Sequence, residues 1–123
     1  MNNQFKRQKK PNHRKKFKIS YKQYSSQCQF KFKIDKYKNN FDVNLIETFG
    51  WYSKDNPNGM SRDHMLSISY GWRENISSKI IKHPANCQLM NYSDNHKKGY
   101  HSSITYKDLL KRIEEWDLIH KEK

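Results

Sequence analysis

Two neighbouring residues, Asp63 and His64, stand at the front of a short β-prone run and carry the side chains that phosphodiester hydrolysis needs. This reaction requires a base that takes a proton from water near neutral pH, and the ordinary pKa of imidazole lies in that range. It also requires a cation to offset charge on phosphorus, and carboxylate and amide oxygens are ligands that Mg²⁺ prefers. Asn95 offers an amide oxygen. These three side chains can act together only if the fold brings them to one place.

Short elements would have to position them. The sequence predicts a strand over 60–69, a long excursion with a helical turn near 78–81, a second strand in "NCQLMNY" and a brief helix in "SDNHKKG". A hairpin returns the chain to its starting edge, and a helix packed across it directs its first turn toward the strand that carries His64. We therefore expect a small α+β protein built on a strand, strand and helix unit.

Two further helices are expected on either side of this unit. In "FDVNLIETFGWY", Asp42 is a plausible N-cap and Gly50 a stop, which predicts a short helix over 42–49. The segment "SITYKDLLKRIEEWDLIH" has one apolar face and predicts the clearest helix, from about 106 to 119. Apolar residues that alternate with polar ones predict a strand or an extended segment on the core: Phe30, Phe32 and Ile34.

The whole chain has a net charge of +13, and most of this positive charge lies in its first third. Residues 1–38 hold 13 of the 25 lysines and arginines but one of the 12 acidic residues. The run "KRQKKPNHRKKFK" contains no acid, so we predict a flexible, disordered polybasic arm over 1–27 and a folded domain over 28–120. Such an arm favours nucleic acid as partner, with a localisation signal, a solubility tail or a membrane-surface anchor as alternatives.

Cysteine content and hydropathy argue against zinc-stapled, disulfide-stabilised and membrane-spanning proteins. Cys28 and Cys87 form no CxxC pair, which excludes a four-cysteine structural zinc site and makes a disulfide scaffold unexpected. The sequence contains no apolar stretch of membrane-spanning length. We therefore expect a cytoplasmic protein with reduced thiols and no membrane association.

The segment "DHMLSISYGWRENI...HPANCQLMNYSDNHKK" resembles the HNH nucleases, also called His-Me finger or ββα-metal nucleases. In that family a DH pair ends the first strand, an Asn begins the second, and a His or Asn nine residues later lies in the short helix. The matching residues here are Asp63, His64, Asn86 and Asn95. The chain looks closest to small phage and mobile-element endonucleases of the homing type, in the branch without structural zinc. A phage origin would place the protein in the host cytoplasm.

The resemblance implies a ββα-metal core and a DNA endonuclease that hydrolyses phosphodiester bonds with one divalent cation, Mg²⁺ or another such as Mn²⁺. It implies that His64 is the general base, that Asp63 and Asn95 bind the metal, and that Asn86 holds the backbone of the catalytic histidine in place. A monomer would nick one strand, and a weak homodimer could cut both. We further expect four basic side chains to hold the DNA backbone: Lys97, Lys98, Arg73 and Lys82.

Two other functions stay open at this stage. A basic nucleic-acid-binding protein on the same fold would have lost cleavage, although the intact Asp63, His64 and Asn95 argue against that. An RNA-directed protein would also suit a polybasic arm, but the sequence lacks an RNA-binding signature. An isolated Asp-His pair is most often ordinary surface polarity, whereas four matched positions with one correct spacing favour the nuclease.

Overall fold

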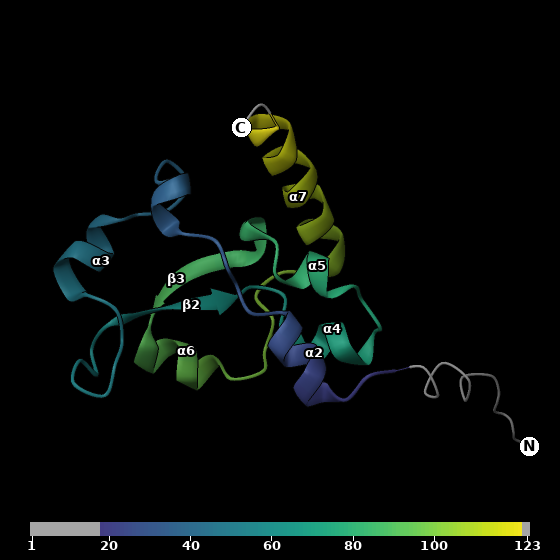
Figure 1. Cartoon of the computed structure of the whole chain (residues 1–123), viewed down its shortest axis with the longest axis horizontal. Helices are drawn as coiled ribbons and strands as arrows, with labels where there is room; N and C mark the ends of the chain where they lie inside the picture. The colour runs from purple at the N-terminus through teal and green to yellow at the C-terminus, as the bar shows by residue number, and fades with distance from the viewer. Residues whose placement is uncertain (1–17, 122–123) are drawn as a thin grey trace, which may run out of the picture.

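The computed structural model describes residues 18–121, and most of the predicted arm, residues 1–17, lies outside this range. The architecture is mixed α+β, as predicted, with short helices around a two-stranded antiparallel sheet (Figure 1). The elements in chain order are α2 (Tyr21–Gln27), the 3₁₀ helix η1 (Ile34–Tyr37), α3 (Asn44–Phe49), β2 (Met60–His64), α4 (Ile68–Arg73), α5 (Ser78–Ile81), the 3₁₀ helix η2 (Pro84–Asn86), β3 (Cys87–Asn91), α6 (Tyr92–Lys98) and α7 (Tyr106–His120).

The folded part begins earlier than the sequence predicted, because α2 occupies the last residues assigned to the arm. Ser20 and Gln23 form a capping box: the Ser20 hydroxyl accepts from the Gln23 amide at 3.1 Å, and the Gln23 side chain accepts from the Ser20 amide at 3.3 Å. Tyr24 is buried and donates its phenolic hydrogen to the Ile76 carbonyl at 2.7 Å. Helix α2 is therefore part of the core.

The two strands form the predicted hairpin, and α6 follows directly. Met60 lies opposite Asn91 and His64 lies opposite Cys87. The Asn91 side chain caps α6 by accepting from the Ser93 amide at 2.8 Å, and Gly99 ends the helix with φ of 57°. Helix α6 packs against both strands and, in Figure 1, lies on the other side of the sheet from α7. The order of strand, strand and helix is thus as predicted.

The first strand is shorter than predicted, because it ends at His64 rather than continuing to residue 69. Ser67 starts α4 instead: its hydroxyl accepts from the Tyr70 amide at 3.0 Å. Met65 and Leu66 are buried in the turn between the two elements. A short apolar run is compatible with a strand or with a buried turn. Here Ser67, which follows the run, caps α4, so the run forms a buried turn.

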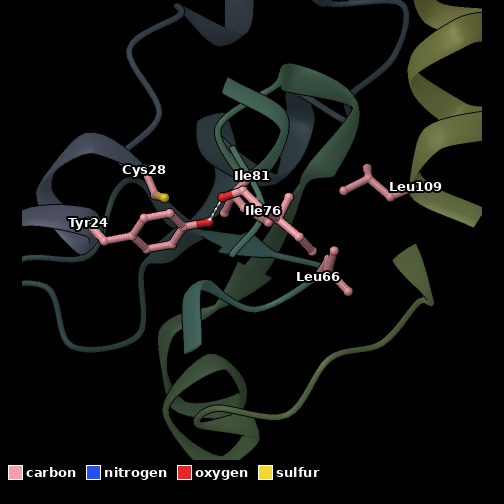
Figure 2. Close-up of a cluster of buried hydrophobic side chains, with 6 residues drawn as sticks. All are labelled: Tyr24, Cys28, Leu66, Ile76, Ile81 and Leu109. Carbon is pink, nitrogen blue, oxygen red and sulfur yellow. Dashed lines mark hydrogen bonds between the residues drawn. The ribbon is translucent and has the colours of Figure 1, made fainter. Parts of the chain in front are cut away.

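A compact aliphatic core lies where α2, α4, α5 and α7 meet beyond the end of β2. Helices α2 and α4 approach so closely that a Cβ on Gly71 would come within 2.4 Å of the Tyr24 hydroxyl oxygen and 2.8 Å of Ile81. A side chain at this position would therefore require Tyr24 and Ile81 to move. Six buried side chains form the cluster drawn in Figure 2: Tyr24, Cys28, Leu66, Ile76, Ile81 and Leu109.

A chain of aromatic contacts connects α7 with the end of β2. Ring centroids are 4.9 Å apart for Trp116 and Tyr37, 5.6 Å for Tyr37 and Phe32, 5.7 Å for Phe32 and Phe30, and 4.0 Å for Phe30 and His64. Phe30 and Phe32 lie outside any helix or strand, and Ile34 begins the 3₁₀ helix η1, so the predicted strand or extended segment over these three residues does not form. Aromatic packing therefore supplements the small aliphatic core.

The two flanking helices form where the sequence predicted them. The Asp42 side chain accepts from the Asn44 amide at 3.1 Å before α3, and Gly50 follows this helix with φ of 69°. The Thr105 hydroxyl accepts from the Asp108 amide at 3.1 Å at the start of α7. Over residues 18–121, no helix combines the length and the apolar character needed to cross a membrane.

Candidate active site

Asp63, His64 and Asn95 line one pocket of about 200 Å³. Asp63 and His64 occupy the last two positions of β2, and Asn95 lies in α6, which packs against that strand. Tyr21 and Tyr100 contribute to the same pocket from α2 and from the segment after α6. The fold therefore brings together the three side chains whose convergence the sequence predicted.

The orientation of His64 is fixed by the end of α2. Its Nε2 lies 2.8 Å from the Cys28 carbonyl oxygen, and its ring stacks on Phe30 at a centroid distance of 4.0 Å. Cys28 is the C-cap of α2, where carbonyl groups lack partners within the helix. A carbonyl can only accept a hydrogen bond, so Nε2 carries the hydrogen and the lone pair of the neutral ring lies on Nδ1.

Burial lowers the pKa of His64 from its ordinary value of 6.5. Burial penalises the charged imidazolium, whereas the hydrogen bond to Cys28 and the charge of Asp63 act in the opposite direction with smaller effects. The charge of Lys98 lowers the pKa further. The ring is therefore kept neutral near pH 7, which is the protonation state that a general base requires.

Asp63 is only 4% exposed, and protein donors engage both of its carboxylate oxygens. The Gln88 amide nitrogen donates to Oδ2 at 2.7 Å, and the Lys98 ammonium donates to Oδ1 at 3.1 Å. Lys98 also donates to the His64 carbonyl at 2.9 Å. Each carboxylate oxygen has a second lone pair, so Asp63 can also bind a cation or accept a hydrogen bond on the pocket side while these contacts hold it in place.

The amide of Asn95 is oriented by its neighbours. Its Nδ2 donates to the Ser61 hydroxyl at 2.9 Å and lies 3.5 Å from the Arg62 carbonyl. The Ser61 hydroxyl donates its hydrogen to the Met90 carbonyl at 3.1 Å, so its oxygen can only accept a hydrogen bond from Asn95. No hydrogen bond from residues 18–121 reaches the Asn95 Oδ1, so this oxygen is available as a ligand.

Asn86 is completely buried and does not line the pocket. Its Oδ1 accepts from the Leu66 amide at 2.8 Å, while its Nδ2 donates to the carbonyls of Leu66 at 3.1 Å and Ile81 at 2.8 Å. Its backbone carbonyl accepts from the Met65 amide at 2.8 Å. These bonds fix the two residues that follow His64, so Asn86 is placed to position the histidine rather than to touch a substrate.

The four basic residues predicted to bind DNA lie in different environments. Lys97 and Arg73 are exposed, and Lys82 is half-buried at the end of α5. The Lys98 side chain is only 13% exposed and bonds to Asp63 and His64, so its ammonium is engaged inside the protein. Among the described residues, those lining the pocket do not include any of the four.

Arg62 lines the pocket, and the sequence analysis did not single it out. Its guanidinium carbon lies 5.1 Å from the centroid of Phe32 and 5.3 Å from that of Trp51, and Nη1 donates to the Phe32 carbonyl at 2.7 Å. Side chains two residues apart in a strand project to the same face, so the position of His64 was a signal for Arg62. The Cys28 carbonyl, in contrast, is a backbone group without any side-chain signal.

The donor chemistry of the pocket suits a hard cation. A carboxylate oxygen from Asp63 and an amide oxygen from Asn95 match Mg²⁺, which commonly binds one or two protein ligands and keeps several waters. In the part of the chain that the structure describes, no group of three or more His, Cys, Asp or Glu side chains could hold a metal ion. A pair made of one carboxylate and one amide is a different, smaller donor set.

Comparisons with known proteins add no relative. No protein-family model matches this chain, and neither the curated proteins nor the solved structures contain a significant match to it. Any assignment of function therefore depends on the chemistry and geometry of the pocket.

Proposed function

We propose that this protein is a metal-dependent DNA endonuclease of the HNH type, with β2, β3 and α6 as its ββα-metal core. One observation carries the proposal: Asp63, His64 and Asn95 line a single pocket, with His64 Nδ1 and Asn95 Oδ1 free to act. A base and two oxygen ligands are the minimum that one-metal hydrolysis of a phosphodiester needs from the protein.

His64 is the general base of the proposed reaction. Its Nδ1 takes a proton from a water molecule as the water oxygen bonds to phosphorus; the bond between phosphorus and the departing oxygen breaks, and that oxygen takes a proton from solvent. The Cys28 carbonyl keeps the ring in the required tautomer and stabilises the imidazolium that forms, because Nε2 donates to it at 2.8 Å. Asn86 fixes the backbone beyond His64, and Phe30 fixes the ring plane. These contacts preorganise the base before substrate binds.

Asp63 and Asn95 are the residues that would hold the divalent cation, Mg²⁺ or Mn²⁺. When bound, this cation offsets charge on the phosphate and assists the departing oxygen. Gln88 and Lys98 hold the carboxylate of Asp63 from the protein side, and Ser61 orients the amide of Asn95. The ligands are therefore held in place by a second layer of hydrogen bonds, as metal sites require.

DNA is the partner that the charge distribution favours. Most of the net charge of +13 comes from residues 1–38, where a basic arm would neutralise phosphates without reading sequence. Such binding increases the encounter rate with DNA and is sensitive to salt. A monomer with one pocket would nick one strand, so cutting both strands would require a second copy or a second event.

The test is cleavage of supercoiled plasmid with Mg²⁺, with chelator, and with the His64→Ala protein. We expect Mg²⁺-dependent nicking that falls by roughly a factor of a thousand in His64→Ala, since general-base catalysis typically contributes 10²- to 10⁴-fold. His101→Ala is the matched control, because His101 is exposed, and it should retain full activity. Undiminished cleavage by His64→Ala would rule out this base.

The second candidate is a basic nucleic-acid-binding protein on the same fold, favoured by the same excess of positive charge. It would bind the plasmid tightly and leave it intact with Mg²⁺ or Mn²⁺. Substituting RNA for DNA in the same assay separates either function from an RNA-directed one.

A further inference from the structure

Lys98 is a buried cation at the candidate metal ligand. Its side chain is 13% exposed, that of Asp63 is 5% exposed, and the two form an ion pair at 3.1 Å. Its second acceptor is the His64 carbonyl at 2.9 Å. Asp63 lines the pocket whereas Lys98 is not among its lining residues in the described part of the chain. The ammonium therefore approaches the carboxylate from the protein side and leaves the pocket side open.

The charges of the protein groups around the pocket do not by themselves favour a divalent cation. Asp63 is the one carboxylate among the described residues that line it, and the Lys98 ammonium already compensates that charge. Arg62 lines the same pocket and adds a positive charge, while the other candidate ligand, Asn95, is neutral. The three charged groups together are net positive, so they repel a free cation and attract a phosphate.

We propose that Lys98 makes cation binding conditional on DNA: its charge keeps the affinity of the free protein for the divalent cation low, and the scissile phosphate restores the missing negative charge. This inference depends on the proposed nuclease function and assigns Lys98 a role in metal recruitment rather than in holding the DNA backbone. By linkage, the factor by which DNA raises cation affinity equals the factor by which the cation raises DNA affinity.

Lys98 has a suitable neighbour for a controlled experiment. Lys97 precedes it in α6, carries the same charge and is exposed to solvent, where its field is screened. Lys98→Gln and Lys97→Gln therefore make the same change in net charge at two different places. Lys98→Met is a second neutral variant that keeps the apolar stem, and Lys98→Arg keeps the charge.

The first measurement is a titration of the full-length protein with Mn²⁺ in the absence of DNA, in which the electron paramagnetic resonance signal reports the concentration of free Mn²⁺. Thermal melts check that each variant is folded. We expect Lys98→Gln and Lys98→Met to bind Mn²⁺ about tenfold more tightly than wild type or more, within the usual range of coupling between sites. Lys97→Gln should stay within about twofold of wild type, since its charge is screened by solvent, and Lys98→Arg should resemble wild type.

The second measurement is the affinity for a labelled DNA duplex, with and without Mn²⁺ at constant ionic strength, in a His64→Ala background that prevents cleavage. Mn²⁺ should raise DNA affinity when Lys98 is present and raise it less in Lys98→Gln. Equal Mn²⁺ affinity in Lys98→Gln and Lys97→Gln, or weaker binding by both neutral Lys98 variants, would overturn the inference. If His64-dependent cleavage by the wild-type protein persists in that case, the proposed nuclease function still stands.

Discussion

The unit formed by β2, β3 and α6 and the helix α7 are held in place in different ways. The strands have five residues each and α6 has seven, whereas α7 has 15. Helix α7 starts at a side-chain cap and buries Leu109 and Trp116 on one face. Such signals are local to the helix, and a helix of 15 residues is near the length at which isolated helices become marginally stable. The two strands and the seven-residue α6 are too short to be stable alone, although Asn91 caps α6 and Gly99 ends it.

The site unit depends on hydrogen bonds between residues far apart in the chain. His64 bonds to the carbonyl of a residue 36 positions earlier, and the Lys98 ammonium bonds to a carboxylate 35 positions earlier. Asn86 bonds to Leu66, which is 20 positions away. The side chains that line the pocket are thus held by contacts between distant parts of the chain, so their positions depend on the folding of the whole domain.

Helix α7 packs against the segment before β3, and among the described residues that line the pocket none belongs to α7. The Arg112 Nε donates to the Ala85 carbonyl at 3.1 Å, and Asp117 accepts from His83 Nε2 at 2.8 Å. Both partners belong to the turn that leads into Asn86. The comparison therefore predicts that changes in the site unit affect cleavage and stability together, whereas changes in α7 affect stability alone.

The largest expected effect is that of Asn86→Ala. This change leaves the amide and carbonyl of Leu66 and the carbonyl of Ile81 without their buried partner. Buried polar groups without hydrogen bonds cost about 1 to 3 kcal/mol each, so we expect a loss of at least about 3 kcal/mol in the free energy of unfolding. Urea denaturation measures it. Cleavage per folded molecule should fall as well, because the backbone after His64 is released.

Asn39→Ala is the control for that experiment, since Asn39 is exposed and lies far from β2 in the chain. It should change the free energy of unfolding by less than about 0.5 kcal/mol. If the folded fraction of Asn86→Ala cleaved DNA at the full rate, the pocket would be positioned without this residue. The predicted difference between changes near the pocket and changes in α7 would then be wrong.

A smaller effect, on stability alone, is expected for Leu109→Ala in α7. Leu109 is completely buried, and truncation of a buried leucine typically costs about 2 to 5 kcal/mol. Leu110 is the adjacent control: it is 42% exposed, and Leu110→Ala should cost less than about 0.5 kcal/mol. Urea denaturation compares the two. If folded Leu109→Ala lost cleavage as Asn86→Ala is expected to, α7 would have to be counted as part of the site unit.

Local signals in the sequence were sufficient for most helix ends and for the hairpin. The predicted helices over 42–49 and 106–119 form, although Val43 rather than Asp42 is the N-cap of α3, and the predicted helical turn at 78–81 is α5. Asn95 lies in α6 as expected, whereas Asn86 is the last residue of the 3₁₀ helix η2, directly before β3 rather than in it. These features depend on a few adjacent residues, so one sequence was enough.

Other features depended on information that the sequence did not carry locally. The high positive charge of the first third led to the prediction of a flexible arm up to residue 27, but residues 21–27 form α2. Ser20 and Gln23 have the spacing of a capping box, and Tyr24 is buried. The buried pairing of Lys98 required the register of β2, β3 and α6, since its exposure cannot be inferred from a basic helix end. The Cys28 carbonyl could not be identified, because every residue has one.

The smallest expected effect is on the pH dependence of the free energy of unfolding, which should involve His64 in β2 but not Leu109 in α7. In metal-free protein with chelator, burial holds the pKa of His64 below its ordinary value of 6.5, so the unfolded chain binds a proton more readily than the folded one. The contribution of the neutral ring to stability is therefore complete above about pH 6.5 and is lost as pH falls toward the folded-state pKa. Urea denaturation between about pH 7.5 and about pH 5.5 should show a steeper decline for wild type than for His64→Gln, whereas Leu109→Ala should lower stability with the wild-type slope. Identical slopes for wild type and His64→Gln would mean that the folded protein does not disfavour the imidazolium, and His64 would lose the property that suits it to act as a base.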